Sequence, residues 1–348
     1  MLKIYLAPIC HISDPFRGRA GRGHAAAAEV AAGSGFCLAG AMSDDRVLMK
    51  RLRAAGFAAS SVRTASGGAV ALAGLATLED GSRVFAKTLR DLDPEAFELF
   101  EVEAAGLTQL REAGGVSTPP IRLASAELLV LEEMQPRPDG EAFWERLGHM
   151  LAALHTTTVS DRFGWHREGW LGRMRQENAW TDDGHEFFAH RRILRWLPEP
   201  LAESAFDADD RHAIEALCAA LPDLIPARPP SLTHGDLWSE NILATPDGAP
   251  VLIDPATSYT WPEVDLSMLW CSPRPPASER FFAAYREAAP LDDGWEARMP
   301  VLYLRELLSA IAHGDDSWGA VGYVREVIAP FRRRPAPARS NPRKASGR

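Results

Sequence analysis

Residues Leu232–Asp254, LTHGDLWSENILATPDGAPVLID, combine a set of polar side chains with two short apolar runs. The runs, 241–244 and 251–253, flank the turn sequence Thr-Pro-Asp-Gly, which predicts a hairpin. Polar groups beside apolar strands lose contact with water, so they need hydrogen-bonding partners or a function. This segment therefore carries the strongest indication of chemistry in the chain.

The sequence His-Gly-Asp at 234–236, followed by Asn241, indicates phosphoryl transfer. Asp236 and Asn241 have the D-x-x-x-x-N spacing of a kinase catalytic loop, in which the Asp accepts the acceptor's hydroxyl proton and the Asn binds a metal ion. Asp254 closes the hairpin and could hold Mg²⁺, which prefers oxygen ligands. Asp and Gly are also common in ordinary turns, but the ordered set favours a catalytic loop.

The amino-terminal part offers the two residues that hold the phosphates of ATP in a kinase. Lys87 lies in the apolar strand sequence VFAKTL, where the alternative is a strand-edge lysine whose ammonium reaches water. Glu103 follows in FELFEVEAAGLTQL, and its spacing from Phe100 and Leu107 places it on the lobe-facing side of a helix. Glu101 is a substitute candidate. A strand lysine paired with a helical glutamate predicts an ATP site.

Two further segments are candidates for contacts with the nucleotide. Gly67 and Gly68 form a predicted turn before the first strand, where backbone N–H groups could face the phosphates. They are not part of a GxGxxG sequence, and a plain turn is the alternative. The sequence LVLEEM predicts a strand that runs into a connector, where backbone groups of Glu132 and Met134 could pair with adenine.

The remaining pattern predicts a small lobe of antiparallel strands with one inserted helix, followed by a larger, mainly helical lobe. A first helix begins at Ser43 as its cap and ends before Gly56. Strands are predicted over 69–78, 82–89, 121–124 and 128–131, and helices over 94–112, 144–155, 186–197, 208–221, 276–288 and 299–312. We expect a nucleotide-binding lobe over 42–134 and a lobe with the catalytic loop, metal and acceptor site over 135–330.

The net charge of −9 is unevenly distributed, because residues 331–348 hold seven basic residues and no acid. The rest of the chain is therefore more acidic than the net charge implies. An acidic body repels nucleic acid and anionic membranes, so we expect neither as a partner. We expect the Pro-rich basic tail to be disordered.

The cysteines and the amino terminus indicate a cytoplasmic protein. Four cysteines lie far apart without a CxxC pair, which fits neither a disulfide framework nor a zinc site. The Ala- and Gly-rich residues 1–41 predict a disordered leader, with Met42 as a candidate start and a short docked helix over 25–32 as the alternative. No signal peptide or membrane span is predicted.

Over roughly residues 47–331 the chain resembles the fructosamine and ketosamine kinases, relatives of the aminoglycoside and choline phosphotransferases. HGDLWSEN is similar to the family's HGDLWxxN, and LIDPATSYTWPEVDL to its metal-binding Asp-Pro with a later ExDL segment. FGWHREGWLG, Trp180 and EFFAHRRIL resemble blocks of its substrate lobe. The resemblance implies an α+β, two-lobed protein-kinase-like fold.

The resemblance also implies roles for single residues. Asp236 would be the catalytic base, Asn241 and Asp254 would bind Mg²⁺, and Lys87 with Glu103 would position ATP. Trp238 would lie in the sugar-acceptor site, with core packing as the alternative. Asp265 and His155 would support the catalytic loop. The chain departs from the family at Ala69, where a small hydroxyl residue is usual, and matches it loosely over 173–183.

We therefore expect an ATP- and Mg²⁺-dependent kinase that phosphorylates a sugar hydroxyl of a ketosamine, either a small molecule or a glycated protein lysine. An aminoglycoside, an amino alcohol or another hydroxylated metabolite is the alternative acceptor. A non-catalytic pseudokinase is disfavoured, because the charged catalytic set is complete. The sequence leaves the oligomeric state open, with a monomer as the simplest expectation.

Overall fold

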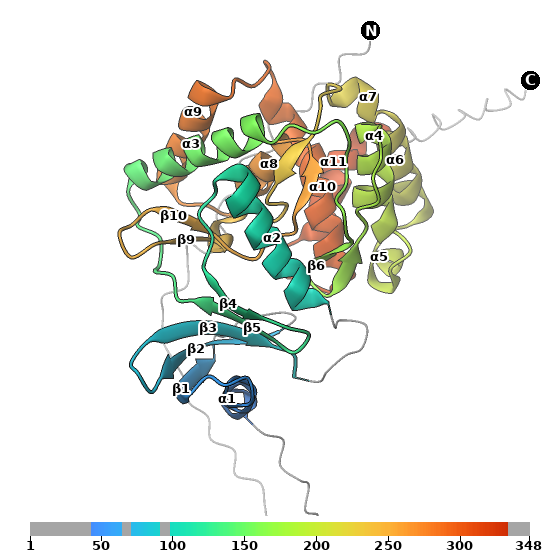
Figure 1. Cartoon of the computed structure of the whole chain (residues 1–348). Coiled ribbons are helices and arrows are strands. Elements are labelled where there is room, and N and C mark those ends of the chain that lie inside the picture. Colours follow the sequence, from blue (N-terminus) through green and yellow to red (C-terminus); the bar gives the residue numbers. More distant parts are fainter. Residues whose placement is uncertain (1–42, 65–70, 91–97, 333–348) are drawn as a thin grey trace, which may run out of the picture.

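The computed structural model describes residues 43–64, 71–90 and 98–332. A sheet with one helix packed on its outer face forms a small lobe, and helices form most of a larger lobe (Figure 1). Gly67, Gly68, the predicted leader over 1–41 and nearly all of the predicted tail over 331–348 lie outside the described residues. The proposals for these segments therefore remain predictions, as does the division into 42–134 and 135–330.

The small lobe is built on a five-stranded antiparallel sheet with the strand order β1-β2-β3-β5-β4. Its elements are α1 (Asp44–Ala54), β1 (Ala59–Thr64), β2 (Leu72–Leu78), β3 (Arg83–Thr88), α2 (Leu99–Gly114), β4 (Ile121–Ala124) and β5 (Leu128–Glu132). The alternation of side chains along each strand separates two apolar faces. Leu48 and Leu52 of α1 pack on the face of the sheet to which Val130 points. Phe100 and Leu107 of α2 pack on the other face, to which Leu129 and Leu131 point.

Strand β1 corrects the prediction that the glycine pair precedes the first strand. Because β1 pairs with β2 through Val62 and Ala76, the sequence places Gly67 and Gly68 between two strands. The sequence ASSVRT lacks the alternation of apolar and polar residues that predicts a strand, because Ala59 is its single buried residue. Ser43 stands at the cap position of α1 as expected, but its side chain makes no capping hydrogen bond.

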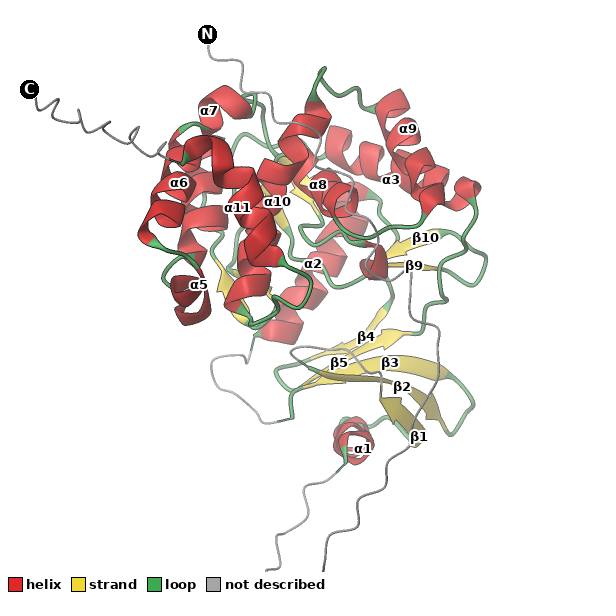
Figure 2. Cartoon of the chain, turned by 180° about the vertical axis from the view of Figure 1, so that it is seen from behind, coloured by secondary structure: helices red, strands yellow, loops and turns green. Residues whose placement is uncertain are grey.

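The larger lobe begins after an isolated bridge between Gln135 and Ala244. Figure 2 shows its short hairpin β9–β10 near the sheet, where the two lobes meet. Its elements are α3 (Glu141–Thr157), β6 (Gly169–Leu171), β7 (Met174–Gln176), α4 (Gly184–Phe188), η2 (Ala189–Ile193), η3 (Leu194–Trp196), α5 (Pro200–Ala205), α6 (Ala208–Ala219), α7 (Leu221–Leu224), β8 (Ser231–Thr233), η4 (Ser239–Asn241), β9 (Ile242–Ala244), β10 (Pro250–Leu252), β11 (Ser258–Thr260), α8 (Glu263–Cys271), η5 (Pro276–Ser278), α9 (Glu279–Ala288), α10 (Trp295–Ala312), α11 (Ala320–Ile328) and η6 (Ala329–Phe331).

The helix predicted over 186–197 is in fact an α-helical turn, a π-helical turn and a 3₁₀ turn in succession. The contacts of Arg192 explain why the periodicity of apolar residues did not predict this change of helix type. Its buried guanidinium donates to the Glu177 carbonyl and the Asn178 side chain, two partners that local sequence does not encode. Similarly, the helix predicted over 276–288 opens with the 3₁₀ turn η5.

Several strands and helices of the larger lobe could not be predicted from the sequence pattern. The three-residue strands of the pairs β6–β7 and β8–β11 are too short to show alternation. Helix α8 is buried on all sides from Glu263 to Leu269, so it lacks the polar face that marks an amphipathic helix. No helix of the described ranges has the length and apolar character needed to cross a membrane.

Helices α3 and α9 pack closely because Gly148 offers no side chain at their contact. A Cβ atom at this position would lie 2.5 Å from the Phe281 carbonyl oxygen and 3.0 Å from the Ala284 Cβ. Those atoms belong to the partner helix and cannot rotate away. The close approach therefore requires glycine at 148.

We predict that Gly148→Ala lowers the free energy of unfolding by about 1–3 kcal/mol, the usual cost of overpacking a tight interior. The matched control is Gly322→Ala in α11, where an added Cβ meets nothing within 4 Å. Alanine there should leave stability unchanged or raise it by up to about 1 kcal/mol, since it is the better helix former. Urea unfolding followed by circular dichroism measures both, and equal stabilities would contradict the packing argument.

Candidate active site

The ammonium of Lys87 lies between two carboxylates from different parts of the chain. Its Nζ atom is 2.8 Å from Oε1 of Glu103 on α2 and 2.5 Å from Oδ1 of Asp254, which follows β10. Lys87 lies on β3, inside the sheet, and is 9% exposed. The alternative of a strand-edge lysine is therefore wrong, and Glu103 rather than the exposed Glu101 is its helical partner.

Burial and charge act in opposite directions on these groups. Burial would lower the pKa of Lys87, but the charges of Asp254 and Glu103 and its hydrogen bonds to both raise it. Burial raises the pKa of Glu103 to about 7. The negative charge of Asp254 also raises it, whereas the positive charge of Lys87 lowers it. When both carboxylates are ionised the trio carries a net negative charge, which favours a further cation beside Asp254.

Asp254 has an unusual backbone that sets the direction of its side chain. Its φ of 55° makes it the one non-glycine residue of the described chain with a positive φ. Such conformations cost free energy and gather at functional sites. The preceding N–H of Ile253 donates to the Asn241 carbonyl at 3.1 Å, so Asn241 and Asp254 are held on adjoining strand ends.

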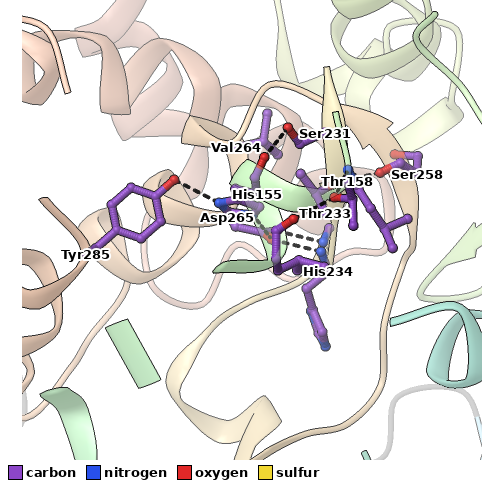
Figure 3. Close-up of polar contacts among 12 residues, drawn as sticks. His155, Thr158, Ser231, Thr233, His234, Ser258, Val264, Asp265 and Tyr285 are labelled. Carbon is purple, nitrogen blue, oxygen red and sulfur yellow. Dashed lines mark hydrogen bonds and ion pairs between the residues drawn. The ribbon is translucent and has the colours of Figure 1, made fainter. Parts of the chain in front are cut away.

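The loop with His234 and Asp236 is held by the buried carboxylate of Asp265. Asp265 accepts hydrogen bonds from the backbone N–H of His234 at 2.8 Å and of Gly235 at 2.7 Å (Figure 3). It also accepts from Nε2 of His155 at 3.2 Å, whose Nδ1 lies 2.9 Å from the Tyr285 hydroxyl. Burial opposes ionisation, but these hydrogen bonds and nearby charges lower the pKa of Asp265 overall.

His234 joins the same loop to the hairpin. Its Nδ1 accepts from the Asp236 N–H at 3.2 Å, so Nε2 carries the proton and donates to the Ile253 carbonyl at 2.8 Å. Burial lowers the pKa of His234, in agreement with a neutral ring. Gly235, with φ of 81°, packs so closely that a Cβ would lie 2.2 Å from the Ala256 carbonyl oxygen. The backbone thus fixes Asp236 relative to Asp254.

Asp236 and Asn241 are in direct contact. Nδ2 of Asn241 donates to the Asp236 carbonyl at 2.8 Å and to its Oδ2 at 3.1 Å. With its nitrogen so engaged, Asn241 has its side-chain oxygen left as a ligand for a hard cation. Burial and the charge of Glu306 raise the pKa of Asp236 well above its ordinary value. Asp236 is thus a stronger base than an aspartate in water.

The other predicted site residues lie around this centre. Glu132 ends β5, and its N–H donates to the Pro120 carbonyl at 2.9 Å, while Met134 lies in the connector to the larger lobe. Trp238, two residues past Asp236, is 39% exposed, so core packing is not its role. Sequence reasoning missed Arg305 and Glu306, although two charges in the apolar helix VLYLRELLSA were a readable signal.

The family model described as fructosamine kinase matches residues 42–318 of the chain. A probable ketoamine kinase of Synechocystis is 32% identical over 219 residues, which cover 62% of this chain and 73% of that protein. A chloroplastic protein-ribulosamine 3-kinase of Oryza sativa subsp. indica is 29% identical over 242 residues, covering 66% and 67% respectively.

A solved structure is similar over nearly the whole fold. The crystal structure of a candidate fructosamine-3-kinase from Thermobifida fusca matches with a TM-score of 0.71 and 30% identity. The match covers 82% of this chain and 96% of that one. The predicted two-lobed protein-kinase-like architecture is therefore confirmed.

We predict that Asp265→Asn removes most of the activity and lowers the free energy of unfolding by about 3 kcal/mol at neutral pH, because an amide cannot replace both anionic oxygens. The lowered pKa of Asp265 fixes the pH dependence. The ionised carboxylate stabilises the fold above its unfolded pKa, near 3.8, and this contribution is lost as the pH falls through the folded pKa. The stability gap between wild type and variant should therefore narrow in acid.

Asp182→Asn is the matched control for this loss of charge, because the Asp182 side chain is 85% exposed and pairs with Arg162 at the surface. Its effect should stay within about 1 kcal/mol at every pH. Urea unfolding over a pH series measures both variants. A gap for Asp265→Asn that stays constant into acid would show that its charge does not hold the loop.

Proposed function

Because the chain belongs to the fructosamine kinase family, we propose that it transfers the γ-phosphate of ATP to a sugar hydroxyl of a ketosamine. The acceptor would be a glycated amine on a small molecule or on a protein lysine. The observation that carries the proposal is the contact of Lys87 with both Glu103 and Asp254, next to the joined pair Asp236 and Asn241. Phosphoryl transfer requires alignment and charge neutralisation more than covalent chemistry, and this arrangement supplies both.

Asp236 is the proposed general base. Its ionised carboxylate would accept the proton of the acceptor hydroxyl as that oxygen attacks the γ-phosphorus and ADP leaves. The Asn241 amide group restrains one carboxylate oxygen and sets the direction of the other. The raised pKa of Asp236 improves proton acceptance, provided that the pH keeps the group ionised.

Asn241 and Asp254 are the proposed ligands of Mg²⁺, and the residues fit this ion. The Asn241 side chain contacts Asp236 through its nitrogen, so its oxygen takes no part in that contact. The Asp254 side chain is 39% exposed. When bound, Mg²⁺ would neutralise charge on the phosphates. Lys87, oriented by Glu103, would contact the α- and β-phosphates from the sheet side.

The remaining nucleotide contacts follow from the connector between the lobes. The Glu132 N–H is already donated to Pro120, so Glu132 would offer adenine its carbonyl oxygen and Met134 would offer its N–H. Gly67 and Gly68 would cover the phosphates with backbone donors. The exposed ring of Trp238 would flank the sugar of the acceptor. We place this activity in the cytoplasm, on a monomer, without nucleic acid or membrane as a partner.

An acceptor panel in an ATP-consumption assay tests the proposed function. The panel compares fructosyl-lysine and ribulosyl-lysine with unmodified lysine, an aminoglycoside and an amino alcohol. We expect kcat/KM to be highest for a ketosamine and turnover of unmodified lysine to be absent. Preference for the aminoglycoside or amino alcohol would favour the alternative acceptor class, and tight ATP binding without any turnover would indicate a pseudokinase.

We predict that Asp236→Asn lowers kcat by a factor of about 10² to 10⁴, the usual contribution of a general base, while ATP affinity stays close to that of wild type. Asparagine keeps the shape of the side chain and removes the proton acceptor. Steady-state kinetics and nucleotide titration measure the two quantities. Turnover within a few-fold of wild type would remove Asp236 from the catalytic role.

Asp254→Asn should raise the Mg²⁺ concentration for half-maximal activity by roughly 10-fold or more, at least the loss that follows removal of an outer-shell partner. Asparagine tolerates the left-handed backbone at this position, so the change isolates the charge. The affinity for ATP without Mg²⁺ should not fall. Asp247→Asn, an exposed change in the turn of the same hairpin, is the control. Equal Mg²⁺ dependence in both variants would contradict the metal role of Asp254.

A further inference from the structure

The segment VLYLRELLSA of helix α10 places two charged residues, Arg305 and Glu306, in an otherwise apolar and largely buried sequence. Arg305 is 2% exposed. Burial of a charged side chain is costly unless every polar atom finds a partner. The contacts of these two residues therefore decide whether they only support the fold or also leave groups for a ligand.

Arg305 is linked through Gln176 to the carbonyl of Ala256, and only one of its two terminal nitrogens takes part. Its Nη2 donates to Oε1 of Gln176 at 2.9 Å, and Nε2 of Gln176 donates to the Ala256 carbonyl at 3.0 Å. That same carbonyl is the atom on which Gly235 packs, one residue before Asp236. Nη1 of Arg305 is buried and has no hydrogen-bond partner in the described part of the chain.

Glu306 has an unpaired acceptor atom, whereas the unpaired atom of Arg305 is a donor. Its Oε2 is buried and lacks a hydrogen-bond partner among residues 43–64, 71–90 and 98–332. Its charge acts on two neighbours, since it helps to raise the pKa of Asp236 and that of the Tyr303 hydroxyl. The contacts of Arg305 with Gln176, and of Gln176 with the carbonyl on which Gly235 packs, bring this turn of α10 to the loop of the proposed base. An unpaired donor atom and an unpaired acceptor atom therefore belong to consecutive residues of that turn.

We propose that Glu306 and Arg305 form an acceptor subsite in which Oε2 of Glu306 binds a protonated amine of the substrate and Nη1 of Arg305 binds a neighbouring sugar oxygen. This inference rests on the proposed function and narrows its substrate to hydroxylated compounds that carry an ammonium group close to the reacting hydroxyl.

Charge and geometry both favour this class. Asp236, Glu306 and Arg305 together carry one net negative charge when both acids are ionised, and a single ammonium neutralises it. An ammonium only donates hydrogen bonds and a guanidinium never accepts them, so the two unpaired atoms require different partners. A ketosamine supplies both, because its amine nitrogen is attached to the carbon next to the one that bears the keto or ring oxygen.

The test uses two acceptors that differ in one atom: N-propyl fructosamine and its ether analogue, in which oxygen replaces the amine nitrogen. The preference is the ratio of kcat/KM for the amine to kcat/KM for the ether. Glu306→Gln should lower this preference by roughly 10- to 100-fold, the range for one hydrogen bond to a charged group. The loss should lie mainly in KM, since the ammonium charge does not change during phosphoryl transfer.

Two variants serve as controls for Glu306→Gln. Glu296→Gln removes one acidic charge from the first turn of the same helix, about 15 Å away by helix rise, and should keep the wild-type preference. Glu306→Asp keeps the charge on a shorter side chain and should retain most of the preference, so it also tests the subsite if the Gln variant does not fold.

The outcomes separate the subsite from the function on which it rests. An unchanged preference in folded Glu306→Gln, or an equal loss in Glu306→Asp and Glu306→Gln, would overturn the subsite while the kinase activity stands. Wild-type protein that phosphorylates neither acceptor would overturn the proposed function itself, and the subsite with it.

Discussion

The ammonium of Lys87 is shared by two carboxylates that lie 16 and 167 positions away in the sequence. A buried charge of this kind is stable only when its partners are in place, so the contact joins β3, α2 and the loop after β10 into one unit. The small lobe cannot shift relative to Asp254 without exposing or unpairing a charge. The nucleotide site that we propose depends on this constraint.

The buried polar groups that support the catalytic loop follow the same rule. Asp265 accepts two backbone N–H groups and His155, and His234 uses both ring nitrogens. These residues are fully engaged, so they act as supports for Asp236. Arg305 and Glu306 each retain an unpaired buried atom. Because buried polar groups are normally paired, we propose that these two atoms are the ones that the acceptor engages.

The sequence predicted those parts of the site that depend on local order. His-Gly-Asp with Asn241, the strand around Lys87 and the helix face of Glu103 were all readable from spacing and periodicity. Contacts between distant segments were not: the burial of Arg192, the register of β1 and the approach of Arg305 to the loop near Ala256 depend on tertiary packing. The positive φ of Asp254 was equally hidden, because aspartate does not require it.

The most direct measurement is mass spectrometry of a ketosamine after incubation with the protein, ATP and Mg²⁺. The account predicts that the ketosamine gains the mass of one phosphoryl group in step with ADP formation, and that the parent amine without its sugar gains none. Consumption of ATP with the ketosamine unchanged, or equal phosphorylation of the parent amine, would contradict it.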